Sequence, residues 1–105
     1  MWYFNIFHIL DYFITSLDHK EVLEGYDVKF ECEVIEDNTT AIWYKDGKEL
    51  MSSKSHVTST CGKKHCLEIV PADVSDAGTY SVNINNRERC AQLKITGIVL
   101  LGILH

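Results

Sequence analysis

The chain has 105 residues, a length that suits one domain with one hydrophobic core. It is 46% hydrophobic and 24% charged, which is ordinary for a globular protein. The formal net charge of -5 and the mixing of both signs along the chain argue against a nucleic-acid partner. No phosphate-binding loop, dinucleotide fingerprint or nucleophile motif occurs in the sequence. We therefore predict no enzyme, no catalytic or cofactor-binding residues, no metal site and no small-molecule substrate.

Both ends of the chain are apolar. Residues 1–10 read MWYFNIFHIL before Asp11 interrupts the run, and residues 98–104 read IVLLGIL. Both runs are shorter than the roughly 20 residues that a membrane-spanning helix needs, so we predict no membrane partner. We interpret residues 1–11 and 97–105 as flanks and 12–96 as the domain. The alternative is that residues 1–16 are a signal sequence, although no Lys or Arg precedes the apolar run.

Between the flanks, apolar residues recur with a period of two, which predicts β-strands. Leu17, Val22 and Gly25 mark an edge strand and its turn. The clearest strand runs from Val28 to Val34, where apolar and charged residues alternate. Such alternation is typical of an antiparallel sheet with one buried face and one wet face. The inward positions that we predict are Phe30, Cys32, Trp43, Leu67, Ile69, Tyr80, Val82, Ile84, Ala91, Leu93 and Ile95.

Turn residues separate these strands. Asp46-Gly47 follows the strand around Trp43, and Asn85-Asn86 forms a hairpin turn before the last strand. The segment from Pro71 to Ala77 should cross the end of the sheets as a helical turn or loop. No helix of useful length is predicted, so the chain belongs to the all-β class.

Three features occur in a fixed order along the chain. Cys32 lies on an early strand, Trp43 on the next, and Asp76-Ala77-Gly78-Thr79-Tyr80 comes late. This order is typical of an immunoglobulin-like antiparallel β-sandwich with Greek-key connections, in which the Trp packs beside the Cys. The usual partner cysteine would follow Tyr80 by two residues, but that position is Val82. The usual inter-sheet disulfide therefore cannot form, which favours a reducing compartment.

Two contacts follow from such a sandwich. The edge strand around Val22-Leu23 should pair with the final strand, Leu93 to Ile95. The Tyr80 hydroxyl should turn back to the backbone near Val74 or Asp76 and fix the corner.

The segment Cys61-Gly62-Lys63-Lys64-His65-Cys66 is the one most able to bind a metal ion. A structural zinc site needs four ligands, and the fourth would have to be His56 or a distant residue. We therefore favour a hairpin whose turn spans Gly62 to His65. In that hairpin Cys61 and Cys66 would face each other and could form a disulfide under oxidation.

The remaining cysteines have separate roles. Cys32 lies on an apolar strand face, where a free cysteine packs like a small hydrophobic residue and burial makes it inert. Cys90 is out of phase with Ala91 and Leu93, so it should face solvent. We predict that all four cysteines are free thiols in the native protein.

From about Tyr12 to Thr96, the sequence resembles the intermediate-set immunoglobulin domains of the giant muscle proteins, a group that includes titin-like, obscurin and myosin-binding protein C chains. Four further segments carry this resemblance, beside Asp76 to Tyr80: Leu17 to Val34, Trp43-Tyr44-Lys45-Asp46-Gly47-Lys48-Glu49-Leu50, Gly62 to Ile69, and Ala91-Gln92-Leu93-Lys94-Ile95.

The resemblance implies a non-enzymatic structural module of a titin-like sarcomeric scaffold in the cytoplasm of muscle. Such a module would bear tension or mediate protein contacts, and its partners would be other protein domains, above all neighbouring immunoglobulin modules in a tandem array. The alternative is an extracellular adhesion or receptor domain behind a signal sequence. An enzyme is a third possibility, but no motif supports it.

Overall fold

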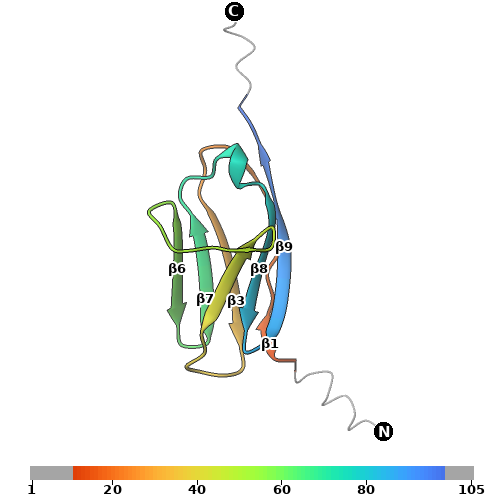
Figure 1. Cartoon of the computed structure of the whole chain (residues 1–105). Helices are drawn as coiled ribbons and strands as arrows, with labels where there is room; N and C mark the ends of the chain where they lie inside the picture. Colours follow the sequence, from red (N-terminus) through yellow and green to blue (C-terminus); the bar gives the residue numbers. More distant parts are fainter. Residues whose placement is uncertain (1–10, 99–105) are drawn as a thin grey trace, which may run out of the picture.

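Two β-sheets pack face to face in the computed structural model of the chain, which describes residues 11–98 (Figure 1). The first sheet has the strand order β1 (Phe13–Thr15), β3 (Val28–Val34), β7 (Lys64–Ile69) and β6 (His56–Cys61). The second has the order β2 (Lys20–Leu23), β9 (Arg87–Thr96), β8 (Gly78–Ile84), β4 (Ala41–Lys45) and β5 (Lys48–Glu49).

The predicted all-β, immunoglobulin-like sandwich is confirmed, with one pair of strands that is not antiparallel. The β2 strand runs parallel to β9, and every other pair is antiparallel. The apolar runs at residues 1–10 and 99–105, on which most of the flank and signal-sequence predictions depend, lie outside the described residues. Within residues 11–98, the structure contains no helix long and apolar enough to cross a membrane.

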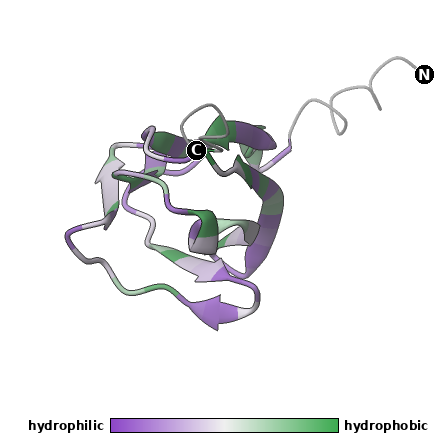
Figure 2. Cartoon of the chain, turned by 90° about the horizontal axis from the view of Figure 1, so that it is seen from above, coloured by the Kyte–Doolittle hydropathy of each residue, from purple (hydrophilic) through white to green (hydrophobic). Residues whose placement is uncertain are grey.

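The core lies between the sheets and follows the alternation of the sequence. Along β3, Phe30, Cys32 and Val34 are fully buried, while Lys29 and Glu31 face solvent. The ribbon accordingly alternates between apolar and polar colours along several strands in Figure 2. The predicted inward residues of the later strands are also buried, except Ile95, which is only partly buried: Leu67, Ile69, Tyr80, Val82, Ile84, Ala91 and Leu93.

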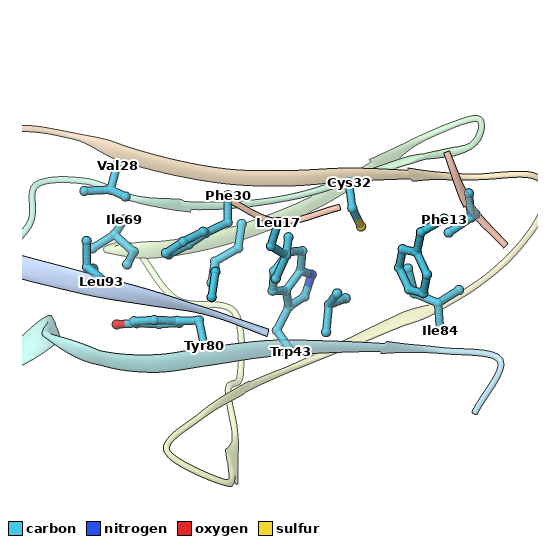
Figure 3. Close-up of a cluster of buried hydrophobic side chains, with 14 of the residues drawn as sticks. Phe13, Leu17, Val28, Phe30, Cys32, Trp43, Ile69, Tyr80, Ile84 and Leu93 are labelled. Atoms are coloured by element: carbon cyan, nitrogen blue, oxygen red, sulfur yellow. The ribbon is translucent and has the colours of Figure 1, made fainter. Parts of the chain in front are cut away.

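Trp43 and Tyr80 occupy the positions that the sequence predicts. Figure 3 shows the Trp43 ring standing between the two sheets, pointing toward Leu17 and next to Cys32 of the opposite sheet. Its exposed fraction is only 2%. The ring of Tyr80 stacks on Phe30 with 5.2 Å between centroids, which joins the two sheets through aromatic contact.

Tyr80 and the short 3₁₀ turn before it, η2 (Val74–Asp76), together form a tyrosine corner. Asp73 caps this turn by accepting the backbone N–H of Ser75, and the Asp76 carboxylate accepts the backbone N–H of Asp73. The Tyr80 hydroxyl donates to the Asp76 carbonyl at 2.6 Å, as predicted. The helical turn predicted between Pro71 and Ala77 is therefore confirmed.

The sequence pattern does not predict the strand β1. Tyr12 and Phe13 are buried, and Asp11 accepts the backbone N–H of Phe13. Two arginines of β9 cover this segment: Arg87 lies over the Tyr12 ring at 4.2 Å, and Arg89 lies over the Phe13 ring at 4.5 Å. Both arginines lie more than 70 positions away along the sequence, so no local sequence pattern indicates these contacts.

Candidate functional site

The second strand of the chain, β2, and the last, β9, form one continuous ladder, which we call the terminal clamp (β2 with residues 93–96 of β9). Lys20 pairs with Leu93, and the register continues to Leu23 opposite Thr96. Beyond the strand, the N–H of Glu24 donates to the Thr96 carbonyl at 2.9 Å. In a parallel ladder the bonded N–H groups alternate, so the N–H of Val22 also points at β9.

Side chains extend the clamp at both ends. At its start, the ring Nδ1 of His19 accepts the backbone N–H of Gln92 at 2.8 Å. At its end, the Glu24 carboxylate accepts the backbone N–H of Ile98 at 3.3 Å. Between them, Lys94 Nζ lies 3.8 Å from the carboxylate of Glu21, both side chains being largely exposed. An exposed pair of this kind adds little stability, so the backbone bonds carry most of the attachment.

The inner side of the clamp rests on the core. Leu93 is buried, and Val22 and Ile95 pack partly buried against the same hydrophobic cluster. Figure 3 shows Leu93 near Ile69 and Tyr80, at the same end of the core. The clamp is thus backed by a packed core on one face, which resists bending of the strands out of the sheet.

Parallel pairing decides how this clamp responds to tension. The chain enters β2 at one end of the sandwich and leaves β9 at the other (Figure 1). Once the short strand β1, which precedes β2 and pairs with β3, is detached, pulling the two ends apart slides β2 and β9 along each other in opposite directions. All ladder bonds are loaded at once in that geometry, whereas an antiparallel hairpin pulled at its open end loses them one at a time.

The segment from Cys61 to Cys66, the one whose sequence is most able to bind a metal ion, does not converge on one point. His65 faces the core, while Cys61 and Cys66 lie on the outer face of the sheet. Adjacent residues of a strand point to opposite faces, so His65 and Cys66 cannot share a ligand. Among the described residues, no group of three or more His, Cys, Asp and Glu side chains is arranged to hold a metal ion.

The predicted turn from Gly62 to His65 is wrong in its length. The structure has a two-residue turn at Gly62-Lys63, and β7 already begins at Lys64. Gly62 adopts φ +62°, the left-handed conformation that such tight hairpin turns require. As a result Cys61 opposes Lys64, and Cys66 opposes Ser59.

The shorter turn also removes the expected Cys61–Cys66 pairing. The two cysteines are diagonal neighbours, whose Cβ atoms are typically about 7–8 Å apart or somewhat less, against about 3.5–4.5 Å in a disulfide. Cys66 instead points its thiol at the Glu31 carboxylate at 3.7 Å. All four cysteines are unpaired in the structure.

Cys32 and Cys90 lie where the sequence predicts. Cys90 is exposed, and Cys32 is inaccessible to solvent. Burial raises the pKa of the Cys32 thiol to about 11, which keeps it protonated and unreactive at neutral pH. Val82, which replaces the usual bridging cysteine, is buried in the same hydrophobic cluster and fills that space with an apolar side chain.

His65, which the sequence places at the end of a hairpin turn, is fully buried. Its Nε2 lies 2.9 Å from the Thr39 hydroxyl and its Nδ1 lies 2.9 Å from the Thr60 hydroxyl. Burial lowers the pKa of His65, so the ring is held neutral. Its role is to join the loop before β4 to the edge strand β6.

His56, which a zinc site would have needed as its fourth ligand unless a distant residue served, is paired with Asp76. Its Nε2 lies 2.9 Å from the Asp76 carboxylate, which is itself mostly buried. This contact ties the start of β6 to η2 across 20 residues of sequence. No spacing rule points to such a pair, so it could not be found from the sequence.

The sequence of this sandwich matches the model of a known protein family. Residues 11–97 match the model of the immunoglobulin I-set domain. The chain belongs to the immunoglobulin I-set family. The core Trp43, the tyrosine corner and the parallel pair of β2 and β9 all lie within the matched residues of this I-set domain.

Known muscle proteins contain similar domains. Cardiac-type myosin-binding protein C of Mus musculus is 38% identical over 80 residues, which cover 74% of this chain and 6% of that protein. The crystal structure of domain I10 from titin is 30% identical with a TM-score of 0.77, covering 80% of this chain and 96% of that one. The I9–I11 tandem from titin is 27% identical with a TM-score of 0.79, covering 81% of this chain and 32% of that one.

The I-set domain described here thus spans a small fraction of the myosin-binding protein C that it matches. Its relatives are structural domains of muscle proteins.

Proposed function

We propose that this I-set domain is a non-enzymatic mechanical link of a titin-like sarcomeric scaffold, one that bears tension between neighbouring modules. The observation that carries the proposal is the terminal clamp. Its parallel ladder lies between the entry and the exit of the domain, so tension along the chain loads it in shear. Each backbone hydrogen bond contributes only about 1 kcal/mol net, so mechanical resistance has to come from simultaneous loading.

The partners that we propose are other protein domains, chiefly neighbouring immunoglobulin modules in a tandem array. The titin relative that contains I9 to I11 is such a tandem, and this domain resembles a third of it. The two ends of the domain lie at opposite poles of the sandwich (Figure 1), which suits a link in a linear array.

We also propose that the domain works in the cytoplasm of muscle, within the myofibril. The similarity to myosin-binding protein C and titin supports this placement, and so does the replacement of the bridging cysteine by Val82. A tagged copy expressed in cultured cardiomyocytes should give a striated pattern. Secretion of the tagged copy would contradict the placement and favour the extracellular alternative.

The folding unit that we propose spans residues 12–96, with 1–11 and 97–105 as flanks and without catalytic, cofactor-binding or metal-binding residues. The regular elements run from Phe13 to Thr96, which supports these limits. A chain trimmed to 12–96 should melt within a few degrees of the full chain, because the contacts that the described residues Asp11 and Ile98 make are few: Asp11 with Arg89 and the N–H of Phe13, and the N–H of Ile98 with Glu24. A much lower melting temperature would show that the flanks belong to the fold.

Single-molecule stretching tests the mechanical proposal. The full chain, held by handles at its two ends, should unfold in one cooperative step whose force rises with pulling speed. About 85 residues extending at about 3.3–3.6 Å each should release roughly 25–30 nm of length. Gradual extension without a force peak would remove the mechanical function.

A further inference from the structure

One end of the sandwich gathers exposed apolar side chains, and we call it the apolar end (Leu23, Tyr26, Val74 and Ile98). Their exposed fractions are 48%, 65%, 47% and 57%. This is the end at which β9 leaves the domain and η2 crosses it, and Figure 2 looks onto it from above. Large apolar side chains that gather on one surface are typical of a protein contact.

Contacts through the backbone show that these residues form one surface. The backbone N–H of Tyr26 donates to the Leu23 carbonyl, so both side chains flank one tight turn. Gly97 then joins this turn to η2. A Cβ atom at Gly97 would stand 3.4 Å from the Val74 side chain and 3.7 Å from the carboxylate of Glu24.

The apolar end also contains an open hollow of about 350 Å³. It is lined by Glu21, Val22, Leu23, Tyr26 and Asp27. The lining therefore combines an aromatic ring and a leucine with two carboxylates, and none of its residues is basic.

The acidic groups continue around the rim. Glu24 directly follows Leu23 of the hollow, with its carboxylate near Gly97, and Asp73 directly precedes Val74. Hydrogen bonds from the Ser75 side chain and backbone lower the pKa of Asp73, so its carboxylate stays charged at neutral pH. Among these rim and lining groups of the described part of the chain, only Glu21 has a basic neighbour within 4 Å, Lys94.

We infer that the apolar end docks a protein segment in which apolar side chains are flanked by Lys or Arg. An apolar centre with an acidic rim is complementary to that chemistry in both polarity and charge. The inference rests on the protein-contact part of the proposed function and goes beyond it by naming the surface and the partner.

Two other occupants fit the charges less well. A second copy of the chain docked end to end would bring its own acidic rim against this one, and like charges in contact disfavour association. Residues 99–105 of the same chain contain neither Lys nor Arg, so the rim does not select them.

The test is titration of the full-length ¹⁵N-labelled chain with a blocked twelve-residue peptide of alternating leucine and arginine pairs. Amide shifts should change at Leu23, Tyr26, Val74 and Ile98, and not on the outer faces of the sheets. A peptide of the same charge with glycine in place of leucine should bind at least about fivefold more weakly, because it lacks the apolar anchor.

Matched variants locate the contact. Tyr26→Ser and Asp27→Lys should each weaken binding of the leucine–arginine peptide by about fivefold or more. Met51→Ser removes an exposed apolar residue outside the apolar end, and Glu68→Lys reverses a charge on the outer face of β7. Both controls should bind the peptide as the parent chain does.

Three results would overturn the inference. They are no binding at millimolar peptide, shift changes centred on a sheet face, and equal binding of the leucine and glycine peptides. None of these results would change the unfolding force measured by single-molecule stretching. Failure of this inference can therefore be distinguished from failure of the mechanical proposal.

Discussion

The carboxylate of Asp46 lies against Gly78, in space that no larger residue at position 78 could share. A Cβ atom at Gly78 would stand 2.6 Å from Asp46 Oδ2 and 2.8 Å from Oδ1. The same carboxylate accepts the backbone N–H of Thr79 at 2.9 Å, and the N–H of Asp46 donates to the Thr79 carbonyl at 2.8 Å. The glycine of the Asp76 to Tyr80 motif thus makes room for the turn after β4.

We expect Gly78→Ala to destabilise the domain by about 1–3 kcal/mol, because it adds a clash with Asp46 to the strain of a φ of +153°. Urea unfolding measures the change. Gly25→Ala is the control, since its φ is +95° but nothing lies within 4 Å of the added atom. If the two variants lose equal stability, and Asp46→Ala does not partly rescue Gly78→Ala, the contact has no energetic role.

Trp43→Ala should cost about 3–5 kcal/mol of stability, because it opens a large cavity between the sheets. Domain stabilities are only about 5–15 kcal/mol, and no disulfide holds this sandwich closed. Tyr44→Ala is a matched control on the same strand, since that ring lies on the partly exposed outer face. Thermal unfolding followed by circular dichroism compares them. A melt of Trp43→Ala close to that of the parent would show that Trp43 is not the centre of the core.

The four thiols should react in an order set by burial. Cys61 and Cys90 are exposed and should label first, Cys66 more slowly, and Cys32 only after unfolding. Its raised pKa of about 11 further suppresses reaction of Cys32 in the native state. Alkylation followed by intact-mass measurement, with and without denaturant and without reductant, checks the order. Fewer than four modified thiols in denaturant would reveal a disulfide and contradict the prediction of free cysteines.

Stability should fall as the pH drops below about 6.5, in part because of His65. Burial lowers the pKa of His65 in the folded state, so the unfolded chain binds the proton more readily. The stability from neutral His65 is present above the ordinary pKa of about 6.5 and is lost as pH falls toward the lower folded value. One proton changes stability by at most about 1.4 kcal/mol per pH unit.

The variant His65→Gln isolates this effect. Glutamine keeps a hydrogen-bond donor and an acceptor for the hydroxyls that bond His65, those of Thr39 and Thr60, but does not titrate. The loss of stability between about pH 6.5 and 5 should therefore become smaller. Urea unfolding at a series of pH values gives both curves. An unchanged slope in the variant would assign the acid sensitivity to other groups.

Much of the core could be predicted because its signal is local. The alternation of Phe30, Cys32 and Val34, and of Tyr80, Val82 and Ile84, places each side chain in the core without knowledge of the partner strand. The tyrosine corner was equally accessible, since the Tyr80 hydroxyl bonds only four residues back.

The errors came where distant contacts or one turn residue decide the geometry. Strand β1 is too short to show the two-residue alternation of apolar and polar side chains. It is held in place by Arg87 and Arg89, which come from the other end of the chain. The turn at Gly62-Lys63 was predicted two residues too long, which moved the partner of Cys61 from Lys64 to Cys66. A left-handed glycine can serve a short or a long turn, so the spacing alone did not decide.

The most direct test of the mechanical account compares two proline variants in single-molecule stretching. Val22→Pro removes a bonded N–H from the terminal clamp, and Val57→Pro does the same on the edge strand β6, outside the loaded pair. The unfolding force should fall clearly in Val22→Pro and stay near the parent value in Val57→Pro, even when urea unfolding shows similar losses of stability. Equal forces in the two variants would contradict the account, because resistance would then follow overall stability and not the clamp between β2 and β9.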